Sequence, residues 1–282
     1  MATLSALRAE LQRVFQDTTG NTLSAVPANQ FINNAIEDFV NWTEPLIREY
    51  AWPVVAYQQC YTLPSDWIKP KLVQWYLNGP IGLAYMGPGE FQDEGLLSRD
   101  TTSTSPVAYT LMDGKLYLGP PSSSSSTSST INMASGLGGS DDVVTLADAS
   151  NFHRPSGYIK IEDEIILYQS VSGNDLGLLL RGQGGTTAAA HSNGQTVTQC
   201  DLVAAYYYSP PALTADSQSP AFDARWHRLI LHRALWQAFT MAGRTQEARD
   251  ALTYYETKIR EAKRSIQRAQ RDNLLRIKRV YR

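Results

Sequence analysis

The chain has 282 residues, a net charge of −2 and a hydrophobic content of 43%. This length allows one large core or two smaller ones, and the composition is that of a globular protein, which excludes a disordered chain. We expect no membrane span, because no stretch approaches the roughly 20 consecutive apolar residues that a bilayer requires. We expect no secretion signal either, because residues 1–16 read as a charged amphipathic helix.

Two amphipathic helices are predicted at the N-terminal end. The first has apolar residues at three- and four-residue spacings behind a cap at Thr3 or Ser5, and Gly20 ends the pattern. The second begins at Pro27 or Ala28, and its wide apolar stripe continues to Trp42. Both stripes need another element to cover them.

Strands and turns follow from Trp52. Apolar and aromatic residues alternate before the turn at residues 64–66 and again before Asn78-Gly79. Asp113-Gly114 lies between two further alternating stretches and is the strongest hairpin signal in the chain. These elements predict a small antiparallel sheet with helices around it.

Residues 122–130 are nearly all Ser and Thr, which predicts a flexible linker. Residues 131–200 then contain short strands between Gly, Asn, Asp and Ser turns, which predicts an inserted all-β, barrel-like module. The strands are expected at residues 143–146, 157–161, 164–168, 176–180 and 196–198. Residues 1–121 and 201–282 would form a discontinuous, mainly helical body. The predicted fold class is therefore α+β.

The body resumes with a strand at residues 202–208 and a helix from Phe222 to the Gly243 break. A last helix is predicted from Thr245 to about Tyr281, roughly 55 Å long at 1.5 Å per residue. Its first half carries a narrow apolar seam suited to packing on a neighbouring helix. The seam consists of Ala248, Leu252, Tyr255, Ile259, Ala262, Ile266 and Ala269.

Charge is distributed unevenly between the body and this last helix. Residues 258–282 contain ten Lys or Arg and two acidic residues, a net of +8, so the remaining 257 residues carry a net of −10. A solvated helix normally mixes opposite charges at four-residue spacing. The asymmetry therefore predicts an arm that binds an acidic partner, either protein or nucleic acid.

No motif indicates an enzyme or a metal site. Residues 182–187 are glycine-rich but lack the lysine of a phosphate-binding loop. The acidic residues 162–164 are interpreted as an exposed charged edge in preference to a metal or acid–base pair. His227 and His232 are five residues apart on a helix and do not form a zinc pair. Cys60 and Cys200 lack metal-ligand spacing and are expected to be buried in a reducing compartment.

Three sequence features together resemble a known family. The first is the N-terminal helix pair followed by Tyr61-Thr62-Leu63-Pro64-Ser65-Asp66, Asn78-Gly79 and Gly114-Lys115-Leu116-Tyr117-Leu118-Gly119-Pro120. The second is Val203-Ala204-Ala205-Tyr206-Tyr207-Tyr208-Ser209-Pro210 followed by a helix pair, and the third is the basic C-terminus. Over residues 1–121 and 201–282 the chain resembles a tailed-phage head-to-tail adaptor, also called a connector or head-completion protein. Residues 157–166, 180–186 and 190–191 resemble a small β module of phage virion proteins, which compact adaptors lack.

This resemblance implies a structural, non-enzymatic virion protein without a cofactor. It would form a ring of about twelve copies at the portal–tail junction, assemble in the host cytoplasm, and let genome DNA pass without sequence specificity. Its partners would be the portal protein, a tail or nozzle protein, and tail fibres or spikes through the β module. The basic helix would bind the portal through Arg260, Lys263, Arg264, Arg268, Arg271, Arg276, Lys278, Arg279, Tyr281 and Arg282.

Two other functions remain open from the residues alone. The basic helix could neutralise nucleic-acid phosphates, which would make the chain a nucleic-acid-binding protein. Alternatively, the β module could bind a receptor or glycan through exposed Tyr158, Tyr168 and His191.

Overall fold

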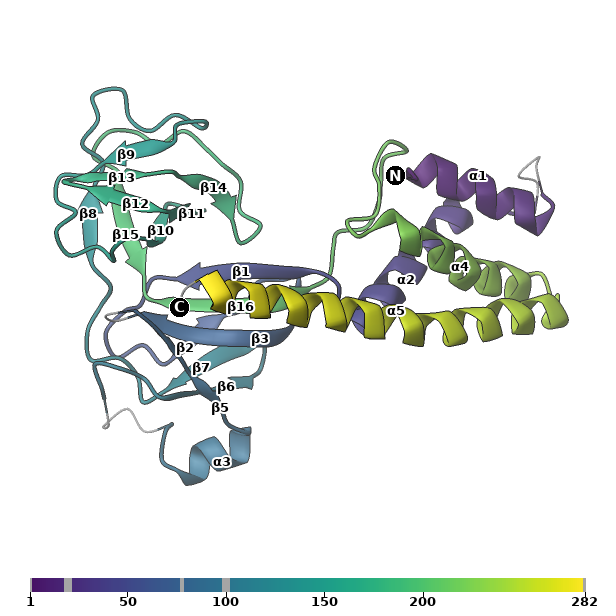
Figure 1. Cartoon of the computed structure of the whole chain (residues 1–282), viewed down its shortest axis with the longest axis horizontal. Helices are drawn as coiled ribbons and strands as arrows, with labels where there is room; N and C mark the ends of the chain where they lie inside the picture. The colour runs from purple at the N-terminus through teal and green to yellow at the C-terminus, as the bar shows by residue number, and fades with distance from the viewer. Residues whose placement is uncertain (1, 18–21, 77–78, 98–101, 281–282) are drawn as a thin grey trace. The chain divides into compact units, whose positions relative to one another are not determined.

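The computed structural model describes residues 2–17, 22–76, 79–97 and 102–280, the last ten of them by their backbone. The chain forms two compact units. The first combines Met1–Ile47 with Tyr207–Arg282, and the second is Arg48–Tyr206. The first unit is helical and the second is largely β (Figure 1).

In its described residues, the helical unit packs four α-helices and one 3₁₀ turn. They are α1 (Leu4–Phe15), α2 (Ala25–Thr43), η1 (Ala224–Trp226), α4 (His227–Met241) and α5 (Thr245–Val280). The apolar faces predicted for α1 and α2 are buried and meet buried residues of α4, except that Trp42, predicted to continue the α2 stripe, is 58% exposed. Phe15 of α1 packs on Phe239 of α4 with ring centroids 5.4 Å apart, so segments far apart in sequence share one core.

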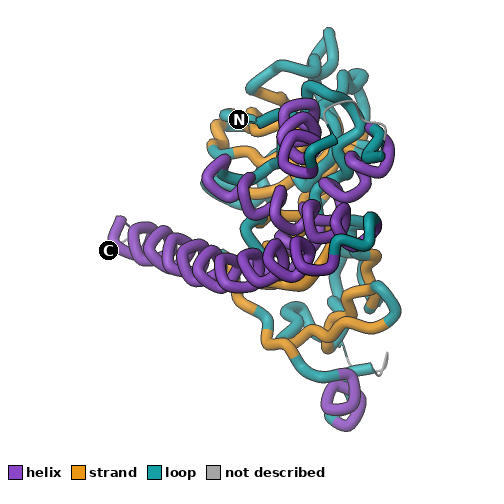
Figure 2. The backbone as a smooth tube through the Cα atoms, turned by 90° about the vertical axis from the view of Figure 1, so that its right-hand side faces the viewer, coloured by secondary structure: helices purple, strands orange, loops and turns teal. Residues whose placement is uncertain are grey.

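Local signals explain where these helices begin and end. Thr3 caps α1, because its hydroxyl accepts a 3.3 Å hydrogen bond from the backbone N–H of Ala6. Gln16 adopts a left-handed conformation that ends α1 well before Gly20. Gly243, with φ +69°, separates α4 from α5. The last helix then continues unbroken for 36 residues (Figure 2), about 54 Å at 1.5 Å per residue.

In the described residues, the strands of the second unit form four small sheets. The first two have the strand orders β1-β16-β3-β4 and β2-β7-β6-β5, and the other two have β14-β11-β10-β15-β8 and β12-β13-β9. The bounds in the first two sheets, with α3, are β1 (Ile47–Trp52), β2 (Cys60–Thr62), β3 (Trp67–Tyr76), β4 (Pro80–Gly82), β5 (Ala84–Tyr85), α3 (Pro88–Asp93), β6 (Ala108–Met112), β7 (Lys115–Gly119) and β16 (Leu202–Tyr208). The bounds in the other two are β8 (Ser128–Thr130), β9 (Val143–Thr145), β10 (Gly157–Ile161), β11 (Glu164–Tyr168), β12 (Ser170–Ser172), β13 (Asp175–Gly177), β14 (Leu180–Gln183) and β15 (Thr196–Cys200).

The hairpin predicted at Asp113-Gly114 is confirmed. Both residues have positive φ, 50° and 69°, as a type I′ turn requires, and β6 and β7 pair antiparallel on either side. The body contains two four-stranded sheets where one small antiparallel sheet was predicted. One pair, β5 with β6, is parallel.

The barrel-like prediction for the β module was wrong for the described residues. They form a five-stranded sheet and a separate three-stranded sheet, with a shared core that includes Ile159, Tyr168 and Val197. Two edge strands, β14 and β8, leave the larger sheet open. The strand expected at residues 176–180 is divided between β13 and β14, because Leu178 has a positive φ of 54°.

Part of the Ser/Thr-rich segment is regular structure. Ser128–Thr130 pairs with β15, and the Ser126 hydroxyl accepts a 2.8 Å hydrogen bond from the backbone N–H of Val54. These short side chains satisfy backbone groups instead of burying apolar area. The division into body, linker and inserted module stays a prediction.

Candidate functional site

Helix α5 packs on the helical unit through one continuous buried face. Its buried positions recur at three- and four-residue spacings, as the predicted seam requires. They are Ala248, Ala251, Tyr255, Ile259, Ala262 and Ile266. Ala251 replaces Leu252 in the seam, and Ala269 is exposed. The last described contact with the bundle is a 2.9 Å hydrogen bond from the Gln270 side-chain amide to the carbonyl oxygen of Glu44.

Three arginines line the opposite face of α5. Arg260, Arg264 and Arg268 are exposed and follow one another at four-residue spacing, so they share one side of the helix. Within the described part of the chain, no carboxylate lies within ion-pair distance of any of the three. We call these residues the arginine stripe. Its positive charge is exposed to solvent and has no carboxylate partner among the described side chains.

The remaining predicted portal-binding residues fall into three groups. Lys263 points toward α2, where its ammonium lies 5.9 Å from the Trp42 ring centroid. Four others belong to α5, but the structure describes only their backbone: Arg271, Arg276, Lys278 and Arg279. Tyr281 and Arg282 lie outside the described residues.

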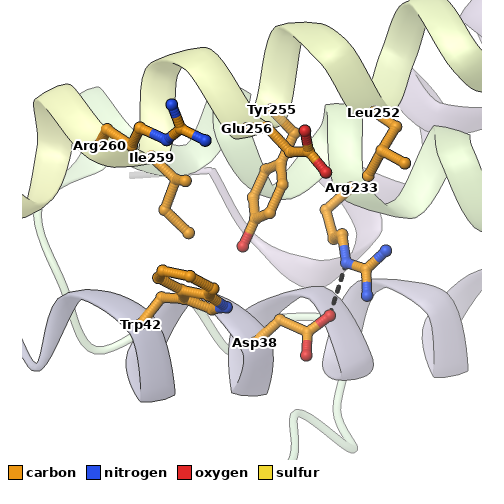
Figure 3. Close-up of a pocket in the computed structure, with 8 residues that line it drawn as sticks. All are labelled: Asp38, Trp42, Arg233, Leu252, Tyr255, Glu256, Ile259 and Arg260. Atoms are coloured by element: carbon orange, nitrogen blue, oxygen red, sulfur yellow. Dashed lines mark hydrogen bonds and ion pairs between the residues drawn. The ribbon is translucent and has the colours of Figure 1, made fainter.

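A groove of about 250 Å³ opens between α2 and α5 (Figure 3). Leu252, Tyr255 and Ile259 form its α5 side, and Trp42 forms its α2 side. At one end Arg233 of α4 donates a 2.5 Å hydrogen bond to the Asp38 carboxylate, which neutralises both charges. Glu256 and Arg260 complete the lining from α5.

The Tyr255 hydroxyl has no hydrogen-bond partner among the described residues, although the residue is only 5% exposed. Figure 3 shows this hydroxyl pointing from α5 into the space beside Trp42. Burial raises the pKa of Tyr255, and the Asp38 carboxylate raises it further, while Arg233 opposes the shift. The hydroxyl therefore stays protonated and is available as a hydrogen-bond donor.

Of the acidic residues 162–164, Glu162 and Asp163 are exposed as predicted, whereas Glu164 is buried, which corrects the predicted exposed edge at that residue. Glu164 is buried and accepts two hydrogen bonds from Arg181, at 2.8 and 2.7 Å, and one from His191 at 2.8 Å. Burial alone would raise the pKa of Glu164. The bonds from Arg181 and His191 and from the backbone N–H groups of Ala189 and Gly182 outweigh this and lower it to about 2. The cluster is a buried ion pair that fixes the loop carrying His191.

The other chemistry-bearing residues have structural roles. Gly184 and Gly185 have positive φ, and an added Cβ would lie 2.8 Å from Tyr50 and 2.6 Å from Arg48, so this run allows close packing on β1. His232 stacks on Tyr254. Cys200 is buried as predicted, whereas Cys60 is half-buried, which corrects the prediction for that residue.

No metal centre or membrane helix emerges from the residues that can be placed. Within residues 2–17, 22–76, 79–97 and 102–280, no group of three or more His, Cys, Asp or Glu side chains could hold a metal ion. No helix of this part combines the length and apolarity needed to cross a membrane.

Sequence reasoning missed the groove, although Trp42 carried a usable signal. The buried face of α2 includes Phe39, Val40 and Thr43, and Trp42 lies about a quarter turn from that face at 100° per residue. Trp42 was assigned to the apolar stripe, but it is 58% exposed, and tryptophan is a residue type enriched in protein interfaces.

Comparison with known families was made over the whole chain. A family model described as SU10 adaptor protein matches residues 2–279. A comparison with curated proteins finds no similar sequence.

Proposed function

The chain belongs to the SU10 adaptor protein family, and from this premise we propose that it forms a ring that joins the portal to the tail or nozzle. Genome DNA would pass through the channel of this ring. The C-terminal helix α5 would bind the portal.

Membership in the family establishes the general role. The protein is a structural adaptor of the phage virion and not an enzyme, which confirms the family resemblance drawn from the sequence. As an adaptor it binds neighbouring virion proteins. Which neighbour each surface contacts, and how many copies assemble, belong to the proposal.

The arginine stripe carries the portal-binding part of the proposal. It lies on a helix whose other face is fixed to the bundle, so its three arginines project from one side of the helix, and none has an ion-pair partner among the side chains that the structure describes. Guanidinium groups recognise carboxylates through bidentate hydrogen bonds. The stripe therefore suits an acidic protein surface.

Repetition around a ring supplies the strength that a single copy lacks. One exposed ion pair contributes about 0.2–1 kcal/mol, so one adaptor would bind poorly. Once the first subunits of a ring are bound, the others bind at a high effective concentration. Assembly would therefore depend on the portal, and stable rings of the isolated protein would contradict this step.

The alternative of a glycan- or receptor-binding β module loses its support. Tyr158, Tyr168 and His191 were expected in exposed loops, but all three are at most 5% exposed. The Tyr158 hydroxyl donates to the Glu49 carboxylate, and the Tyr168 hydroxyl donates to the carbonyl oxygen of His153 at 2.9 Å. Contact of this module with fibres or spikes remains a proposal.

We expect the purified protein, mixed with the portal of the same virion, to form a ring at one end of the portal in low-resolution electron microscopy. Absence of such a complex at low salt would contradict portal binding.

The same preparation tests the nucleic-acid alternative by salt titration with duplex DNA. Sequence-specific or tight DNA binding, with a log–log salt slope near −0.9 for each phosphate contact, would favour that alternative. Weak binding without sequence preference agrees with a DNA channel.

A further inference from the structure

The groove between α2 and α5 has the properties of a receptor for one side chain of a partner. Its 250 Å³ exceed the roughly 150 Å³ of an engineered apolar cavity that binds benzene, so an aromatic or long aliphatic side chain fits. The lining is mainly apolar, from Trp42, Leu252 and Ile259. Such pockets characterise the energetic centres of protein interfaces.

The Tyr255 hydroxyl is the second, independent indication of a ligand. Buried polar groups are almost always hydrogen-bonded, because an unpaired donor loses its water without compensation. This donor is buried, unpaired within the described residues and directed into the groove. A backbone carbonyl of an incoming segment would satisfy it.

Charge around the groove indicates the kind of segment. The Asp38–Arg233 pair is neutral as a unit. The other charged side chains at the groove are one acidic residue, Glu256, and two basic residues, Arg260 and Lys263. Arg264 extends the positive charge along α5. The surface next to Trp42 is therefore net positive and complements an acidic segment.

We propose that this groove binds one aromatic or long aliphatic side chain on an acidic segment of the portal subunit, with the Tyr255 hydroxyl donating to a backbone carbonyl of that segment. The inference rests on the proposed function and adds an apolar anchor to it. The groove and the arginine stripe share Arg260, so they form one continuous surface.

Replacing Trp42 by alanine tests the anchor, with the intact portal as the probe. Trp42 is 58% exposed, so the folded protein changes little, whereas loss of an interface tryptophan weakens binding on the order of 30-fold. Val26→Ala is the matched control, because Val26 is a 79% exposed apolar residue on the same helix. Portal affinity is measured by biolayer interferometry, and the control is expected to stay within about twofold of wild type.

The Tyr255→Phe substitution separates recognition from folding. Removing an unpaired buried hydroxyl is expected to leave the melting temperature of the free protein unchanged or higher. Portal affinity should fall by roughly five- to tenfold, because the hydrogen bond to the partner is lost. Unchanged affinity would overturn the assignment of the hydroxyl.

Two further outcomes distinguish this inference from the proposed function. If Arg264→Glu weakens portal binding but Trp42→Ala does not, the groove is excluded and portal docking stands. If the wild-type protein does not bind the portal, both the proposed portal docking and the groove inference are wrong. A photo-crosslinker, p-benzoylphenylalanine, in place of Trp42 in assembled particles should label the portal, and labelling of a second adaptor copy instead would overturn the choice of partner.

Discussion

Replacement of Glu164 by glutamine is expected to lower the free energy of unfolding of the β-rich unit by about 3–5 kcal/mol, the range for removing one partner of a buried ion pair. Glutamine keeps the shape of the side chain but removes its charge. Arg181, whose side chain is 9% exposed, would lose its buried counter-charge, and His191, 1% exposed, would lose a charged hydrogen-bond partner. Single domains have a total stability of about 5–15 kcal/mol, so a large share would be lost.

Glu162→Gln provides the matched control. Glu162 accepts a 2.8 Å hydrogen bond from the other ring nitrogen of His191, but its side chain is 52% exposed. Water replaces its contribution, so we expect a loss within about 1 kcal/mol. Hydrogen exchange of peptides from residues 157–200, followed by mass spectrometry, reports the opening of this region for both variants. If the amides of this region were equally protected from exchange in the two variants, burial of Glu164 would not explain its contribution to stability.

The stability gap between wild type and Glu164→Gln should depend on pH in a defined direction. The pKa of Glu164 is about 2 in the folded protein and 4.5 when unperturbed. A carboxylate with a lowered folded pKa stabilises the protein above its unfolded pKa and loses this effect as pH falls. The contribution of Glu164 to this gap should therefore be fully present above about pH 4.5 and be lost toward about pH 2, by about 3 kcal/mol in total. Urea unfolding at pH 7, 4 and 3 measures it, and a gap that widens on acidification would refute the ion-pair account.

Short-range signals made the helices and the hairpin predictable. The Thr3 cap, the Asp113-Gly114 turn and the Gly243 break each act within a few residues, where local conformation decides the structure. Strand β16 also has the predicted bounds, because a short continuous run of apolar and aromatic residues that ends at Pro210-Pro211 is itself a local strand signal. The family resemblance rested on these same local features.

The features that the sequence did not predict depend on residues that are far apart in the chain. Glu164 is buried because Arg181 and His191, 17 and 27 residues later, fold over it, whereas its neighbours in sequence indicated an exposed edge. The β1 strand was not predicted, because its hydrogen-bonding neighbour β16 begins 150 residues after β1 ends. The groove likewise exists only where α2 and α5 meet, so neither helix pattern predicts it alone.

Replacing Arg264 and Arg268 together by glutamate is expected to abolish joining of the adaptor to the portal. Each reversal removes a favourable contact of about 0.2–1 kcal/mol and introduces repulsion of similar size. The change is repeated in every subunit of the proposed ring, so we expect a loss of infectious particles on the order of a hundredfold or more. Both residues are exposed, and folding of the helical unit should be unaffected.

Arg249→Glu separates this effect from a general change in charge. Arg249 is exposed on the same helix, 15 residues before Arg264 and outside the arginine stripe, so its reversal should leave joining near wild-type levels. Complementation of an adaptor-deficient phage, scored by plaque titre and by the portal content of adaptor pull-downs, measures both variants. Because salt screens exposed charges, wild-type joining should also weaken as ionic strength rises from 0.05 to about 0.5 M. If the double variant yields infectious particles at the level of Arg249→Glu, the arginine stripe does not bind the portal, and the docking surface must lie elsewhere on the chain.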